Sequence, residues 1–254
     1  MTSPTRALAI LDLFSHERPV WQPDQINEVL GYTRATGYRY VKDLVQAGFL
    51  QKTAAGGYAL GGRIIELDYQ LRQSDPVLLA ARPVMDALAA ACGLDAVLSV
   101  LFAGPKVIDT YRASVQPTLQ LTYGRGRPRP LFRSGAPKIL LSGLQRAPLL
   151  KLYEARQAEI AASGMGESWE LFRSYLTRVR KQGYYRSSGE LEPGVGAAVV
   201  PVFNSDGDMV AALALVGTDA MIDRHSEAQL RGWLAPAAQG IQHRLAQAAA
   251  VMPP

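Results

Sequence analysis

The sequence predicts an α+β fold in two domains, because its hydrophobic pattern changes character along the 254 residues. Apolar residues first recur at helical spacing and then give way to a short, glycine-rich hairpin. Further along, helical segments alternate with short apolar runs, and turn residues 204–208 join two of these runs. Helices that cover an antiparallel sheet form an α+β domain. The length fits two domains of about 100–200 residues each.

The N-terminal part is expected to hold two helices before residue 31. Ser3 and Pro4 offer an N-cap and a proline at the first helical position. A second helix begins near Pro23 and ends at Gly31. The apolar residues of these two helices are Ala7, Ile10, Leu11 and Phe14, then Ile26, Val29 and Leu30.

A third helix follows after the short turn Gly31-Tyr32, and it is the candidate for reading DNA. Thr33 is placed to cap it and Gly48 to end it. Helices joined by a short turn that contains glycine form the helix-turn-helix pattern. The short strands expected on either side of residues 54–57 would then form a wing. The buried stripe of the third helix is expected to be Gly37, Val41, Leu44 and Val45.

The outward face of the third helix carries guanidinium groups, hydroxyls and a phenol, which suit phosphate oxygens and base edges. The alternative interpretation is an ordinary amphipathic surface helix. The expected DNA contacts are Thr33, Arg34, Ala35, Thr36, Tyr38, Arg39, Tyr40 and Lys42.

Composition narrows the classes of protein. There is no charged segment followed by an apolar core, so no signal peptide is expected. No run approaches the roughly 20 apolar residues of a membrane-spanning helix. Cys92 is the only cysteine, which excludes an internal disulfide and agrees with a cytoplasmic location.

The net charge of +5 does not by itself indicate nucleic acid. Residues 1–75 hold eight Lys/Arg and eight Asp/Glu, whereas residues 110–153 hold eight Lys/Arg and no acid. The basic segment, Arg125 to Arg133, has three interpretations: attraction of an anionic ligand, a further DNA contact, or a solvated or oligomer-facing loop. The third is favoured.

In the C-terminal part, strands are expected at 96–102, 107–111, 118–123, 197–203 and 209–216. Helices are expected at 62–73, 77–92, 137–143, 148–162 and 168–182. Ser226 and Gln229 form a capping box for a last helix that runs to about residue 249.

Catalytic patterns are missing from the sequence, so neither an enzyme nor a cofactor or metal is expected. His16, His225 and His243 are scattered, and there is no HExxH or GxSxG motif. The short sequence Gly194-Val195-Gly196 precedes a strand and does not open a helix, unlike a nucleotide-binding loop.

The chain resembles the IclR family of bacterial transcriptional regulators. GYTRATGYRYVKDL, AGFL and GGYALGGRIIELDYQ follow the N-terminal pattern of that family. Residues 130–142, PLFRSGAPKILLS, and residues 182–217 follow its C-terminal pattern, although Phe132 and Pro137 stand where the family has histidine and glycine. Lys138 agrees with the family pattern.

The resemblance implies a winged helix-turn-helix domain at 1–61, a linker helix at 62–75 and a GAF-like effector domain with an antiparallel sheet at 76–254. It also implies a homodimer or tetramer that binds a palindromic operator in double-stranded DNA, with no membrane partner. Control by a small organic effector is expected, and repression is the favoured sign of control. The alternative is a GAF-like binding module or an enzyme that acts without DNA.

Carried over by position, the resemblance places the effector against Leu119, Leu121, Ser134, Gly135, Ala136, Ser187, Glu190, Ala197, Ala214 and Val216. Arg133 is added as the arginine of the basic segment that stands beside Ser134. The backbone N–H groups of Gly135 and Ala136, at a helix start, suit a carboxylate. Apolar side chains at Ala197, Ala214 and Val216 favour an aromatic or acyl effector. These three residues would equally fit an ordinary sheet core.

Overall fold

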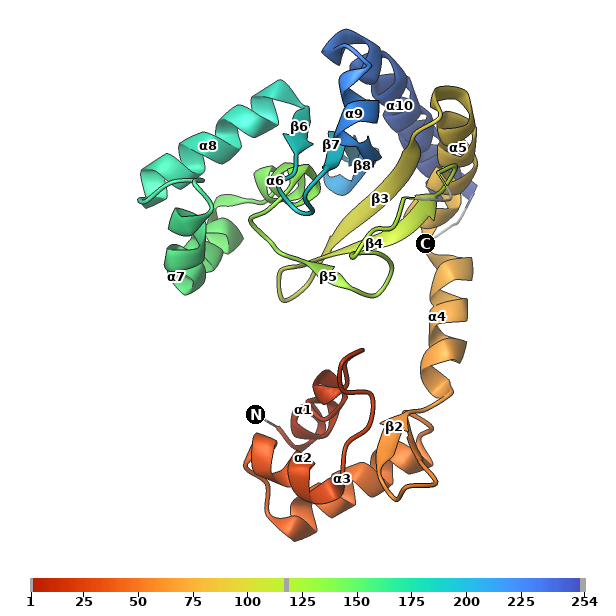
Figure 1. The fold of residues 1–254 in the computed structure, drawn as a ribbon, viewed down its shortest axis with the longest axis vertical. Coiled ribbons are helices and arrows are strands. Elements are labelled where there is room, and N and C mark those ends of the chain that lie inside the picture. Colours follow the sequence, from red (N-terminus) through yellow and green to blue (C-terminus); the bar gives the residue numbers. More distant parts are fainter. Residues whose placement is uncertain (1, 117–118, 252–254) are drawn as a thin grey trace. The chain divides into compact units, whose positions relative to one another are not determined.

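The computed structural model describes residues 2–116 and 119–251. The chain divides between Ser74 and Asp75 into two compact units. The N-terminal unit contains a helix-turn-helix and a two-stranded wing, and the C-terminal unit contains a sheet with helices on both faces (Figure 1). This is the expected α+β organisation.

In the N-terminal unit, the first three helices, a 3-10 turn and a two-stranded wing share one small core, and a fourth helix without buried residues follows. The elements are α1 (Ser3–Leu8), η1 (Leu11–Leu13), α2 (Pro23–Leu30), α3 (Arg34–Gln46), β1 (Leu50–Lys52), β2 (Tyr58–Leu60) and α4 (Arg63–Ser74). The core residues are Ile10, Trp21, Ile26, Tyr40, Val41, Leu44 and Leu50. The strands of the wing are antiparallel, with Leu50 opposite Leu60.

Three expectations for this unit were wrong in detail. The first helix is not continuous, because α1 ends at Leu8 and η1 follows as a separate turn. The N-cap is Thr2, and Ser3 is the first helical residue. Val45 is 36% exposed and does not belong to the buried stripe of α3.

The C-terminal unit is built on a six-stranded antiparallel sheet in the order β5-β4-β3-β8-β7-β6. Its strands are β3 (Asp95–Phe102), β4 (Lys106–Ala113), β5 (Pro128–Arg129), β6 (Tyr185–Ser188), β7 (Val195–Phe203) and β8 (Met209–Thr218). Its helices are α5 (Pro76–Cys92), α6 (Gly135–Ser142), α7 (Arg146–Ala162), α8 (Trp169–Gln182), α9 (Asp219–Asp223) and α10 (Glu227–Val251).

Each face of the sheet has its own hydrophobic core. Helices α5 and α10 pack on one face, and α6 packs on the other with α8 behind it (Figure 1). The alternation of side chains along a strand sends neighbouring residues to opposite cores. Leu213 and Leu215 of β8 therefore belong to the α5–α10 core, and Ala214 and Val216 to the α6 core.

The strand expected at 118–123 is the main error in this unit. Residues 119–123 are irregular, and Thr118 lies outside the described residues. The outer neighbour of β4 in the sheet is the short β5. Three elements, β5, β6 and α9, were not anticipated. The capping box at Ser226 and Gln229 is present, since each backbone N–H donates to the other side chain.

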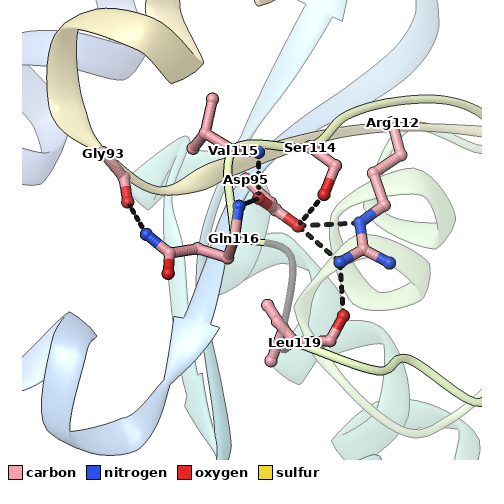
Figure 2. A network of polar contacts seen from close by, with 7 residues as sticks. All are labelled: Gly93, Asp95, Arg112, Ser114, Val115, Gln116 and Leu119. Carbon is pink, nitrogen blue, oxygen red and sulfur yellow. Dashed lines mark hydrogen bonds and ion pairs between the residues drawn. The ribbon is translucent and has the colours of Figure 1, made fainter.

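A buried carboxylate holds the start of the irregular segment to the sheet (Figure 2). Asp95, the first residue of β3, is fully buried and accepts hydrogen bonds from the Arg112 guanidinium and the Ser114 hydroxyl. The backbone N–H groups of Val115 and Gln116 donate to its other oxygen at 2.8 and 3.0 Å. The chain after β4 is therefore tied to β3.

Within the described part of the chain, no helix has the length and apolar character needed to cross a bilayer.

Candidate functional site

The first candidate site is the exposed face of α3. Thr33 caps the helix, since its hydroxyl oxygen accepts a hydrogen bond from the Thr36 backbone N–H at 3.3 Å. Most of the expected contact residues are exposed, and Tyr38 is 61% exposed. The exposed members are Thr33, Arg34, Ala35, Tyr38, Arg39 and Lys42, and Thr36 is half-buried. The helix start thus presents guanidinium, ammonium, hydroxyl and phenol groups to solvent.

Tyr40 is an exception, and its assignment to the DNA face was wrong. The side chain is 4% exposed and belongs to the core of the N-terminal unit. Its ring meets that of Tyr32 edge-on at 5.6 Å, and its hydroxyl lies 3.1 Å from the Ser3 hydroxyl. Tyr40 therefore holds α1 against α3.

The second candidate site is a small cavity between α6 and the sheet. Eight of the expected effector residues line it: Leu121, Ser134, Gly135, Ala136, Ser187, Ala197, Ala214 and Val216. The remaining lining residues are Ser99, Arg129, Leu191, Glu192, Val195 and Val199. Its volume is about 30 Å³, so it has room for little more than a water molecule. A ligand larger than this would require part of the cavity wall to move outward.

The start of α6 forms one end of this cavity. Ser134 has φ of 68°, a left-handed conformation that is uncommon for a residue with a side chain. Its hydroxyl is buried and has no hydrogen-bond partner among the described residues. The orphan N–H groups of a helix start favour a negative charge. The helix-start N–H groups of Gly135 and Ala136 therefore lie beside an unused hydroxyl, whereas the Ser134 N–H donates to Glu190.

Another part of the cavity wall carries a polar cluster of Ser99, Asp109 and Arg129. Arg129 donates to both carboxylate oxygens of Asp109, at 2.7 and 2.6 Å, and Ser99 donates to the same carboxylate at 2.6 Å. Asp109 is 3% exposed and Ser99 is fully buried. Sequence reasoning missed this cluster, because the sheet register brings the three residues together.

Leu119, Arg133 and Glu190 do not line this cavity, contrary to their expected role. The Leu119 carbonyl accepts from Arg112, and the Arg133 guanidinium donates to the Glu190 carbonyl at 3.0 Å. Arg133 and Glu190 line a separate, open depression of about 760 Å³ beside α7 and α8. Leu119 is thus held to strand β4 through Arg112, and Arg133 is held to the loop that carries Glu190.

Glu190 is the centre of an ionic cluster that holds the loop after β6 to α6. Its carboxylate accepts from Lys138 at 2.5 Å, from the Tyr185 hydroxyl at 2.9 Å and from the Ser134 backbone N–H at 3.2 Å. Burial raises the pKa of Tyr185 above its usual range, and a hydrogen bond with Tyr175 and the charge of Glu190 act in the same direction. Tyr185 therefore remains a proton donor.

The basic segment, expected to be a solvated or oligomer-facing loop, is solvated only in part: Arg127 and Arg133 are exposed, whereas Arg125 and Arg129 are half-buried. Arg125 donates to the Thr110 carbonyl and Arg127 to the Thr122 carbonyl, both at 2.8 Å. The Arg129 side chain is only 9% exposed. Of these four arginines, Arg129 is the one that lines the cavity.

Comparison with known proteins shows which family this architecture belongs to. The model of the bacterial transcriptional regulator IclR C-terminal domain matches residues 70–243, and that of the IclR helix-turn-helix domain matches residues 3–54. The chain belongs to the IclR family. It is therefore a DNA-binding transcriptional regulator and not an enzyme.

Relatives within the IclR family cover nearly the whole chain. The HTH-type transcriptional regulator XynR of Escherichia coli is 28% identical over 96% of both chains. The crystal structure of an IclR family transcriptional regulator from Brucella abortus is similar with a TM-score of 0.77 at 18% identity, covering 100% of this chain and 93% of that one. An IclR homologue from Microbacterium hydrocarbonoxydans, complexed with 4-hydroxybenzoate, has a TM-score of 0.71 at 22% identity and covers 96% and 99%.

Proposed function

We propose that this IclR-family regulator is a repressor whose affinity for a palindromic operator is controlled by a small organic acid. The observation that carries the proposal is the cavity under α6, where an unused hydroxyl and helix-start donors face the apolar side chains of β7 and β8. A carboxylate suits the first part of this wall and an aromatic or acyl body suits the second. The relative from Microbacterium hydrocarbonoxydans, which is complexed with 4-hydroxybenzoate, supports a small aromatic acid.

The proposal includes three functional segments in a cytoplasmic protein: DNA reading by residues 1–61, a linker at 62–75 and effector binding by 76–254. Binding of the effector must favour one arrangement of the oligomer over another, because a ligand with equal affinity for both shifts nothing. Helix α4 (Arg63–Ser74) is the segment through which such a change would pass from one unit to the other.

The DNA-reading assignment is tested with an operator selected from a random double-stranded DNA library by the full-length protein. Arg34→Ala and Arg39→Ala should each weaken binding in a gel-shift assay. An arginine that contacts a base contributes roughly 1–3 kcal/mol and its loss relaxes sequence preference, whereas loss of a phosphate contact weakens all sequences evenly. Arg180→Ala, on α8 of the other unit, is the matched control. Unchanged affinity in both α3 variants would refute the assignment.

The effector assignment is tested by a thermal-shift screen of carboxylic and aromatic acids on the full-length protein, followed by gel shifts with each acid that binds. An acid that binds should change operator affinity. Ala214→Trp should abolish this response, because Ala214 is 4% exposed and the larger side chain would fill the cavity. Circular dichroism and retained operator binding check that this variant folds. If the folded variant bound the acid as tightly as wild type, the cavity would not be the effector site.

A further inference from the structure

A charged pair on an otherwise apolar sheet face is the starting point. The α6-facing residues of the central strands include Val97 of β3, Val107 of β4, and Ala212, Ala214 and Val216 of β8. Ser99, Asp109 and Arg129 interrupt this surface on three adjacent strands. A β-bulge between Leu98 and Ser99 places Ser99 opposite Asp109. Bulges redirect side chains and are frequent beside functional sites.

Stability alone does not account for this pair. Removing an ionic pair from water costs about as much as its mutual attraction returns, and replacement by apolar residues of similar volume is often neutral or stabilising. The Arg129 and Asp109 side chains are 9% and 4% exposed. The desolvation of this ion pair therefore costs substantial free energy, on a sheet face whose other buried residues are mostly apolar.

The guanidinium of Arg129 retains donors that the pair does not use. Asp109 takes Nε and Nη2. Nη1, which carries two N–H groups, has no partner among the residues that the structure describes. Arg129 and Ser99 both line the cavity, whereas Asp109 lies behind them. Asp109 thus fixes the guanidinium, and an unused donor edge is left for a ligand.

The charges that line the cavity decide what kind of ligand group suits the unused Nη1 edge of Arg129. The charged lining side chains are Arg129 and Glu192. Arg129 is neutralised by Asp109, and Glu192 accepts from the backbone N–H and hydroxyl of Thr122. A second carboxylate would therefore bring an uncompensated negative charge close to Asp109. A neutral oxygen acceptor accepts from the unused N–H groups of Arg129 without repulsion from Asp109.

We propose that Arg129 is a specificity-determining residue of the cavity, selecting organic acids that carry a neutral oxygen acceptor, a hydroxyl or a carbonyl, away from the carboxylate. The carboxylate lies at residues 134–136, the apolar body lies against β7 and β8, and the second oxygen accepts from Arg129. The inference rests on the proposed function and adds the class of effector.

The test is calorimetric titration of the full-length protein with two matched series of acids. One series is benzoate, 4-hydroxybenzoate and terephthalate, and the other is pentanoate, 4-oxopentanoate and glutarate. Wild type should bind the hydroxy or oxo acid of at least one series about tenfold or more tightly than the plain acid, as expected for a hydrogen bond to a charged donor. The dicarboxylate should bind more weakly than the hydroxy or oxo acid.

Arg129→Lys keeps the charge, but its single ammonium lacks the planar fork that pairs with Asp109 on one edge and holds another edge toward the cavity, so the preference should fall to near unity. Since this change disturbs a buried pair, the double variant Asp109→Leu/Arg129→Met is the second test, because it leaves neither charge unpaired. Arg127→Lys is the control, on the same segment and exposed. It should keep the wild-type preference.

The outcomes separate the two proposals. If an acid binds and changes operator affinity but the Arg129 variants keep the wild-type preference, or if the dicarboxylates bind most tightly, the role of Arg129 is refuted and the effector cavity stands. If no acid of either series binds wild type at millimolar concentration, the role of Arg129 and the proposed acid effector both fall.

Discussion

At the scale of single residues, Asp95 shows how one carboxylate organises a segment without regular structure. It satisfies one guanidinium, one hydroxyl and two backbone N–H groups from a fully buried position (Figure 2). A hydrogen bond to a charged group contributes more than one between neutral groups. Arg112 also donates to the Leu119 carbonyl, two residues before Leu121 in the cavity wall, so Asp95 and its partner hold a segment that reaches the cavity.

Asp95→Leu should destabilise the C-terminal unit by about 3–5 kcal/mol, because it leaves Arg112 and two backbone donors without their buried acceptor. Urea unfolding of the full chain measures the change. Asp206→Leu, in the exposed turn between β7 and β8, is the control and should alter stability by no more than about 0.5 kcal/mol. Equal stability of the two variants would contradict the structural role given to Asp95.

Tyr185 should make stability depend on alkaline pH. Its pKa in the folded protein is raised by burial, by Tyr175 and by Glu190. In the unfolded chain it ionises near pH 10, so above about pH 10 the unfolded state holds fewer protons than the native state, and stability falls as pH rises. The loss between neutral and alkaline pH should be smaller in Tyr185→Phe than in wild type. The same loss in both proteins would contradict this account.

At the scale of elements, the junction between the wing and α3 depends on a glycine. A Cβ at Gly61 would lie 2.1 Å from the Gly48 carbonyl oxygen, and the backbone of Gly61 also donates to the Phe49 carbonyl. Both neighbours are backbone, so neither has a flexible end that could swing away. The end of β2 therefore passes directly against the turn that ends α3.

Gly61→Ala should destabilise the N-terminal unit by about 1–3 kcal/mol through this overlap and weaken DNA binding with it. Gly62→Ala is the matched control, because a Cβ there meets nothing within 4 Å. Thermal unfolding of the full-length variants, followed by gel shift with the selected operator, measures both effects. Wild-type behaviour of Gly61→Ala would show that the junction opens without cost.

Elements with a local signal could be predicted from the sequence. Thr33 before α3 and residues 204–208 between β7 and β8 identify a cap and a turn through neighbouring residues alone. The burial of Tyr40 also had a local signal, since residues 37, 40, 41 and 44 follow helical spacing. Arg129 had none, because its partner Asp109 is twenty positions away and meets it only in the folded sheet.

At the scale of the whole molecule, the protein should be a homodimer or tetramer. One helix-turn-helix unit buries too little surface for tight specific binding, and a two-fold dimer reads half-sites about 10 base pairs apart or multiples of that. Exposed apolar side chains on α1 and α4 are candidate contacts: Leu8 is 53% exposed, Leu67 37% and Leu71 51%. A monomer in light scattering at micromolar concentration, with operator present, would refute the assembly.

The small volume of the cavity has a consequence for how fast this regulator responds. If the pocket must open before an acid is admitted, the observed binding rate at high acid concentration levels off at the rate of loop opening. Apparent affinity is also lowered by the fraction of molecules that are open. Brief fluctuations in metabolite concentration that are shorter than the opening time would then leave the operator complex undisturbed, and only a sustained supply of the acid would alter transcription.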